Sequence, residues 1–110
     1  MFTPEFEKLT NEQFGRCYDV LFEKAKQYSI GTEDRLHAFK VAASFQGITS
    51  KQALLGMLTK HLVSISDMVK SDKQYSIETW DEKITDSINY LLLLRALEVE
   101  TQKDACKKED

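Results

Sequence analysis

Polar and charged side chains recur at three- and four-residue spacings inside segments that otherwise carry a helical pattern of apolar residues. Residues at these spacings share one face of a helix, so each set forms a stripe. Burying such groups costs several kcal/mol unless they find partners or a ligand. We therefore expect the stripes to converge on a polar pocket at the waist of a helical bundle; the alternative is that each is a solvated face. The stripes are Asp34, His37 and Lys40; Lys60, Ser64 and Asp67, overlapped by His61, Ser64 and Met68; and Glu82, Asp86 and Asn89, with Lys83 and Tyr90 flanking Asp86.

The basic members of these stripes suit phosphate groups, because cationic donors form short, strong hydrogen bonds to phosphate oxygens. Tyr28 or Trp80 would then stack against a base, although a Trp at a helix start also serves as a core anchor. His61 and Ser64 lie three residues apart without an acid to orient the imidazole, so a hydrolytic dyad is a weak hypothesis. The residues expected to contact phosphates are Lys60, His61, Lys40 and Arg35.

Four helices must position these residues. Apolar periodicity and capping boxes predict helices over about residues 11–28, 33–46 and 50–70, and a fourth from the capping box at Thr79 to about 101. The boxes begin at Thr10, Thr49 and Thr79, and Gly47 should end the second helix. Four helices with short connections predict an all-α, compact bundle. Because the fourth helix is apolar on more than one face, we expect a homo-oligomer; it could instead be the central helix of a monomer.

Length, charge and cysteine content limit the number of domains, the partners and the compartment that we expect. The 110 residues fit one helical domain, residues 1–101, followed by a charged, disordered tail over 102–110. A formal charge of -3 argues against a DNA partner. No apolar run is long enough for a membrane span, and the N-terminus does not resemble a signal peptide. Cys17 and Cys106 are far apart in the sequence and fit no metal-binding spacing. They do not form a disulfide scaffold, so we expect a cytoplasmic protein.

Two strings of sequence carry a resemblance to a known group: KHLVSISDM, residues 60–68, and WDEKITDSINYL, residues 80–91, with EDRLHAFK, residues 33–40, upstream. Over roughly residues 28–97 the chain resembles small phage and prophage proteins of the nucleotide-modification-associated type. Those are similar to the all-α MazG-like nucleotide pyrophosphohydrolases. The resemblance implies an oligomeric helical protein that handles a nucleotide in the host-cell cytoplasm.

The resemblance also implies a magnesium cage built from a Glu-Glu-x-x-Glu cluster on one helix and Glu-x-x-Asp on the next. Asp86 and Tyr90 match part of the second motif, but Lys83 stands where Glu is expected and Glu82 is one position away. The segment 50–66 contains no acidic residue, so the first motif is missing where it should lie. We therefore expect no cofactor and no catalysis. Mg²⁺ enters only if the chain is an enzyme with the ligands Glu33, Asp34, Glu82 and Asp86.

The leading hypothesis is a non-catalytic nucleotide-binding protein of phage type, which would sequester a nucleotide second messenger, cyclic or linear, of host antiphage defence. The alternatives are a divergent Mg²⁺-dependent pyrophosphohydrolase and a helical protein that inhibits a host protein by direct binding. The predicted ligand-binding residues are Tyr28, Arg35, His37, Lys40, Lys60, His61, Ser64, Trp80, Lys83, Asp86, Asn89 and Tyr90.

Overall fold

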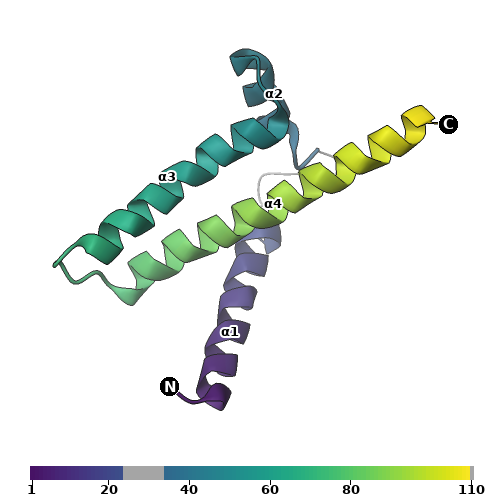
Figure 1. Ribbon diagram of the computed structural model, residues 1–110. Helices are drawn as coiled ribbons and strands as arrows, with labels where there is room; N and C mark the ends of the chain where they lie inside the picture. The colour runs from purple at the N-terminus through teal and green to yellow at the C-terminus, as the bar shows by residue number, and fades with distance from the viewer. Residues whose placement is uncertain (24–33, 110) are drawn as a thin grey trace.

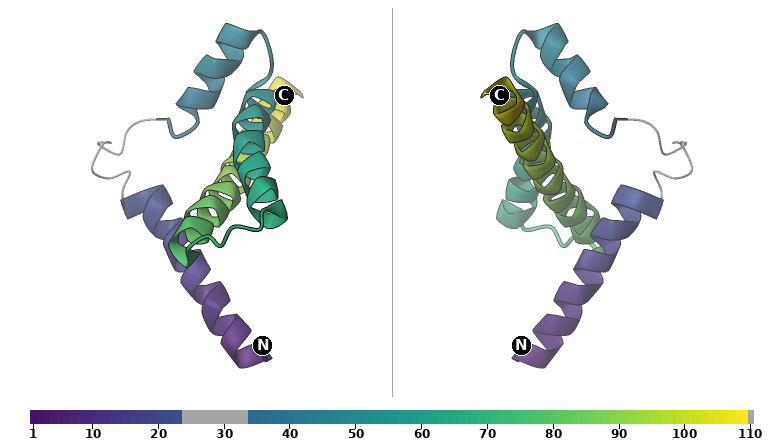
Figure 2. Two further views of the ribbon diagram at one scale, coloured as in Figure 1. Left: turned by 90° about the vertical axis from the view of Figure 1, so that its left-hand side faces the viewer. Right: turned by 90° about the vertical axis from the view of Figure 1, so that its right-hand side faces the viewer.

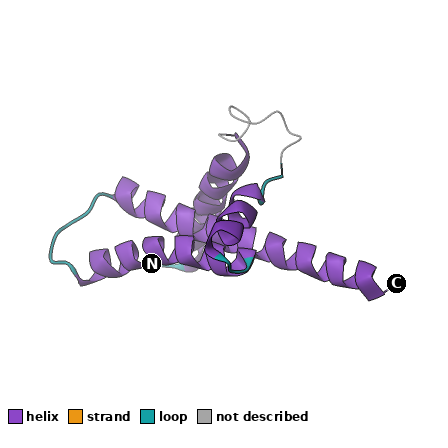
Figure 3. Ribbon diagram, turned by 90° about the horizontal axis from the view of Figure 1, so that it is seen from above, coloured by secondary structure: helices purple, strands orange, loops and turns teal. Residues whose placement is uncertain are grey.

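The computed structural model describes residues 1–23 and 34–109, and this part of the chain is helical without any strand. The four α-helices are α1 (Thr3–Tyr18), α2 (His37–Gln46), α3 (Ser50–Lys70) and α4 (Ile77–Glu109). A short π-helix, η1 (Asp19–Glu23), continues α1 directly. The prediction of an all-α fold with four helices is confirmed (Figures 1 and 3).

Helices α3 and α4 form an antiparallel hairpin that is the frame of the molecule (Figure 1). With 33 residues, α4 is about 50 Å long at 1.5 Å per residue, which accounts for the 52 Å length of the whole molecule. Helix α2 packs near the start of α3, whereas α1 crosses α4 and extends away from the hairpin (Figures 1 and 2). The fold is therefore open, and α4 is its common support.

The signals around α3 are local and were predicted correctly. Thr49 forms the expected capping box: its Oγ1 accepts from the Gln52 N–H at 3.1 Å, and the Gln52 Oε1 accepts from the Thr49 N–H at 2.9 Å. Gly47 ends α2 with a φ of 66°, a left-handed conformation that glycine adopts without strain. These two caps place the sharp corner between α2 and α3.

Four predicted helix bounds are corrected by the structure. Helix α1 begins at Thr3 instead of residue 11, and the Thr10 hydroxyl donates to the Phe6 carbonyl at 2.9 Å within the helix. Helix α4 begins at Ile77, because the hydroxyl of Ser76, and not that of Thr79, accepts from a first-turn N–H. It also continues to Glu109, beyond the end expected near 101. Helix α2 begins at His37, and residue 33, its predicted start, lies outside the described residues.

The core lies where α2, α3 and α4 meet. Leu36, Phe39, Leu54 and Leu97 are its buried members, and Tyr90 packs against them. Burying these side chains supplies the main stabilisation of the three-helix contact. In α1, by contrast, only Cys17 is buried.

Ion pairs connect the N-terminal ends of α2 and α3 to the second half of α4. Lys40 bridges Asp34 and Glu100, with both N–O distances 2.7 Å, and Lys51 pairs with Glu98. The hydrogen bond from Lys40 lowers the pKa of Asp34, and the bonds to Asp34 and Glu100 raise the pKa of Lys40. The bond from Lys51 likewise lowers the pKa of Glu98.

These pKa shifts predict that the contact between α2 and α4 weakens as the pH falls. The folded pKa of Asp34 lies below its ordinary value of about 4, so its stabilisation is complete above that pH and is lost as the pH falls. We expect Lys40→Gln to lower the melting temperature by a few degrees near pH 6, since exposed pairs contribute little each. Near pH 2.5 the variant and the wild type should melt together. Lys70→Gln, which removes an exposed lysine of α3, is the control; an equal Lys40 effect at both pH values would contradict the ion-pair explanation.

Candidate functional site

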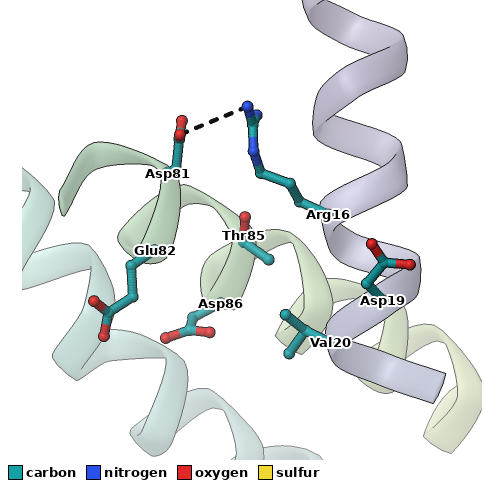
Figure 4. A pocket seen from close by; sticks show the side chains of 7 residues that line it. All are labelled: Arg16, Asp19, Val20, Asp81, Glu82, Thr85 and Asp86. Atoms are coloured by element: carbon teal, nitrogen blue, oxygen red, sulfur yellow. Dashed lines mark ion pairs between the residues drawn. The ribbon is translucent and has the colours of Figure 1, made fainter. Parts of the chain in front are cut away.

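An open groove of about 480 Å³ lies between the end of α1, the π-helix η1 and the first half of α4 (Figure 4). Its charged lining comprises four carboxylates and one guanidinium, so the groove has a negative potential. Arg16 and Asp81 face each other across it, with a closest N–O distance of 3.7 Å. Its lining residues are Arg16, Asp19, Val20, Asp81, Glu82, Thr85 and Asp86.

Polar contacts beside the groove hold α1 against α4. The Gln13 amide donates to the Thr85 hydroxyl at 2.8 Å, and the Asn89 amide donates to the Cys17 carbonyl at 3.4 Å. Cys17 lies just before the helix widens into η1, where the α-helical bonding pattern changes. The Asn89 Oδ1 is buried and has no hydrogen-bond partner in the described structure, an arrangement that costs about 1–3 kcal/mol.

His61 occupies the middle of the face that α3 turns toward α4. Most other residues of that face are apolar: Leu54, Leu58, Ile65 and Met68, spaced by four, seven and three residues, with His61 falling within the gap of seven. The partly buried Ser64 lies on the same face, three residues after His61. The imidazole Nδ1 is 3.8 Å from the Asp86 carboxylate, and the two form an ion pair when the imidazole is protonated. Its ring also lies 5.1 Å from the ring of Tyr90. His61 is thus a polar side chain in a position that packing alone would give to leucine.

Asp86 connects the histidine to the groove, because it both faces His61 and lines the groove wall (Figure 4). The His61–Asp86 contact also shows which neighbouring residues of the antiparallel helices α3 and α4 lie opposite each other. Ser64 lies one turn further along α3 and Lys83 one turn earlier on α4, so the two are about level. Both are partly buried. The candidate site is therefore the seam around His61 and Asp86 together with the adjoining groove.

The remaining predicted residues divide between this seam and other places. Asn89 and Tyr90 are close to it, but Asn89 faces α1, and Tyr90 also packs edge-on against Phe39 at 6.2 Å. Lys60 is exposed and makes no ion pair in the described part of the chain, and Trp80 is partly buried in the first turn of α4. His37 is exposed at the start of α2. Tyr28 lies outside the described residues.

Two predicted groupings are not brought together within one chain. Lys40 and Asp34 lie beside Glu100, which follows Asp86 by fourteen residues and so lies about 21 Å further along α4. Arg35 is placed over the Phe22 ring at 5.8 Å. The phosphate set of Lys40 and Arg35 with Lys60 and His61 is therefore divided.

The predicted magnesium ligands are divided for the same reason. Asp34 lies far from Glu82 and Asp86, and Glu33 is outside the described residues. Within the ranges 1–23 and 34–109, no three His, Cys, Asp or Glu side chains cluster closely enough to hold a metal ion.

Sequence reasoning missed the side of the site formed by α1. Gln13, Arg16 and Asp19 reach the site only because α1 crosses α4. On α4 a signal was present: Asp81, Thr85 and Asn89 form a polar row at four-residue spacing.

Comparisons of this chain with protein families, with curated proteins and with solved structures found no match. Among the described residues, every helix is too short or too polar to pass through a lipid bilayer. The geometry of the site itself therefore carries the functional argument.

The position of His61 predicts a variant that stabilises the fold. His61→Leu would complete the apolar face of α3, while Asp86 remains hydrated by the open groove. We expect the free energy of unfolding to stay level or rise by about 1 kcal/mol, measured by urea denaturation. Thr59→Leu, at an exposed position of the same helix, controls for helix propensity. A clear loss of stability in His61→Leu alone would show that the pair with Asp86 is structural.

Proposed function

We propose that this protein binds a nucleotide without hydrolysing it, at the seam around His61 and Asp86. The observation that carries the proposal is the histidine itself, which stands in the middle of an apolar helix face with a carboxylate and an aromatic ring against it. Polar groups retained where apolar ones would be more stable are typical of functional sites.

The donors around the seam suit a phosphate group. Lys60 is exposed, Lys83 is partly buried, and neither makes an ion pair in the described structure. With the Ser64 hydroxyl and the His61 imidazole they offer several donors, and a cationic donor binds phosphate about twice as strongly as a neutral one. Asp86 would orient the imidazole. The carboxylates of the groove repel phosphate but accept hydrogen bonds from ribose hydroxyls and from amino groups of a base.

The separation of the carboxylates supports the proposal of binding without hydrolysis. Asp34 shares Lys40 with Glu100, which lies about 21 Å from Asp86 along α4, and no three His, Cys, Asp or Glu side chains of the described residues group closely enough to hold one magnesium ion. In the phage setting that the sequence resemblance suggests, a MazG-like scaffold without its cage would sequester a nucleotide messenger of host defence. Such a protein works by mass action and needs no turnover.

Lys60→Ala tests the phosphate contact. Loss of a charge-assisted hydrogen bond of about 1.5–3 kcal/mol should weaken nucleotide binding roughly tenfold to a hundredfold. The measurement is calorimetry of the metal-free protein with cyclic and linear nucleotides. Lys70→Ala, another exposed lysine of α3, should bind as the wild type does.

A chelator distinguishes metal-free nucleotide binding from the alternative that the protein is an Mg²⁺-dependent hydrolase. Binding should be insensitive to EDTA, and Asp86→Asn should weaken it without any effect of added Mg²⁺. Binding that requires Mg²⁺, with Lys60→Ala silent, would contradict the proposal and favour the pyrophosphohydrolase. No binding to any nucleotide tested would remove the proposal altogether.

A second candidate, direct binding to another protein, is favoured by the aromatic row on α1. Phe2, Phe6, Phe14, Tyr18 and Phe22 run from the residue before α1 into η1 at a four-residue spacing that is interrupted at residue 10, and all are exposed. Residues at this spacing form a ridge that packs into grooves of another helix. Single exposed apolar residues are common, but a row of them marks an interaction surface.

The second candidate predicts a partner that depends on this ridge. Wild-type protein should retain a specific protein from a bacterial lysate, and the double variant Phe6→Ser with Phe14→Ser should lose it. Added nucleotide should leave the capture unchanged. Equal capture by both forms would exclude the ridge as the binding surface.

A further inference from the structure

Three neighbouring rows of exposed residues run along the outer face of α1, and the middle row has the shortest side chains. Residues four apart line up along a helix, so adjacent sets at this spacing lie side by side. All of these residues are exposed. The middle row, which we call the Gly15 row, is Asn11, Gly15 and Asp19; the aromatic row Phe14, Tyr18 and Phe22 lies on one side of it, and Glu12 and Arg16 lie on the other.

The aromatic row leaves a large apolar area in contact with water. Phe14, Tyr18 and Phe22 are 61%, 57% and 42% exposed, and the rings of Tyr18 and Phe22 lie 4.8 Å apart. Helix α1 projects from the α3–α4 hairpin (Figure 2), so this outer side remains accessible. Neighbouring aromatic side chains of this kind are the usual anchors of a protein–protein contact, because each buries a large apolar area.

Gly15 makes the centre of the middle row lower than the rows beside it. Glycine inside a helix is less stable than alanine, so a glycine at such a position commonly serves close packing. A Cβ atom added at Gly15 would meet no other atom within 4 Å. The packing of the described residues therefore does not require a glycine here. The space would instead let the backbone of a further helix come close to α1.

The charge around the Gly15 row is negative. Asp19, the last member of the row, lines the acidic groove together with Asp81, Glu82 and Asp86 (Figure 4). Asp19 and Glu82 form no ion pair with any residue that the structure describes. Residues 1–23 as a whole carry five acidic side chains and two basic ones. A partner that covers this face must therefore place positive charge beside its apolar side.

We infer that α1 receives a basic amphipathic helix of another protein, which lies along the Gly15 row. Its apolar face covers Phe14, Tyr18 and Phe22, and its lysine or arginine side chains point toward Asp19 and the groove. A ridge of one helix set between two ridges of another is the commonest form of helix packing. A second copy of α1 would bring the same negative charge and so fits poorly. The inference rests on the second candidate function, binding to another protein, and names the chemistry of that partner.

Selection from a library of helical peptides tests the charge of the partner. Each peptide of about five helical turns carries leucine at helical spacing on one face and lysine, glutamine or glutamate at random on the flanks. The full-length protein is the immobilised target. Enriched peptides should be rich in lysine, and their affinity should fall as the salt concentration rises. Enrichment of neutral or acidic peptides, or of no peptide, would overturn the inference.

Matched glycine variants test the position of the contact. Gly15→Gln fills the middle row with an uncharged side chain that favours the helix. The dissociation constant of an enriched lysine-rich peptide, measured by fluorescence anisotropy, should rise at least about tenfold, while the melting temperature rises by a few degrees. Because stability and binding change in opposite directions, unfolding cannot explain the loss.

Gly56→Gln is the control for the glycine substitution. Gly56 is also exposed inside a helix with no atom near an added Cβ. This variant should be stabilised to a similar extent and should bind the peptide as the wild type does. Its neighbours at three and four residues are neither aromatic nor acidic: Gln52, Ala53, Thr59 and Lys60.

A matched pair of carboxylate variants tests the electrostatic part. Asp19→Asn should weaken binding of the lysine-rich peptide by a few-fold, because each exposed charge pair contributes modestly. Asp104→Asn removes an exposed carboxylate eighteen residues after Asp86 on α4, about 27 Å from the groove. It should leave binding unchanged, and equal effects of the two variants would contradict a contact at Asp19.

The outcomes separate this inference from the function on which it rests. Equal binding by the Gly15→Gln and Gly56→Gln variants would overturn it. Self-association of the wild type that is lost in Gly15→Gln would overturn it as well, because the occupant would then be a second copy. Capture of a protein that depends on Phe6 and Phe14 but not on Gly15 would leave protein binding intact and remove only the site named here.

Discussion

The structure depends on covering α4, a helix with apolar residues on more than one face. Such a helix is stable in water only when other elements bury it. Within the chain, α3 covers one flank with α2 beside it, and α1 with η1 covers a second through Gln13, Cys17 and Val20. The third flank carries Ile77 and Leu91, which are 66% and 53% exposed, and the partly buried Ile84. One flank of α4 therefore stays exposed in the single chain, which accounts for the open shape of the fold.

The polar side chains within these contacts reduce the stability that burial of α4 provides. His61 interrupts the apolar face of α3, and Asn89 leaves a buried oxygen without a partner. Each reduces the stability that leucine would provide at the same place. Both lie at the contacts of α4 with its neighbours, His61 on α3 and Asn89 toward α1, so these contacts contain polar groups as well as apolar ones.

Features that depend on local chemistry could be predicted from the sequence. The Thr49 capping box and Gly47 set the bounds of α3 and the end of α2, because a cap involves only residues within one turn. The same rule failed at Thr10, where the correct spacing occurs inside a helix and the hydroxyl bonds backward to Phe6. At α4, Ser76 caps the helix three residues before the expected box.

The residues of the candidate site were harder to predict, because they depend on which residues of two packed helices lie opposite each other. His61 and Asp86 come together through the hairpin register, whereas Asp34 and Lys40, with equally suitable chemistry, lie beside Glu100. Arg16 and Asp19 join the groove through the crossing of α1, which no local pattern encodes. Charge type identified plausible ligands; tertiary packing decided which of them are neighbours.

The most direct test of how α4 is covered is hydroxyl-radical footprinting of the full chain. Phe45 of α2, which is 87% exposed, serves as the internal reference. The account predicts that Leu54 and Leu97 of the core are protected, whereas Leu91, on the third flank of α4, is oxidised in proportion to its exposure. Oxidation of Leu97 as fast as that of Leu91 would contradict it.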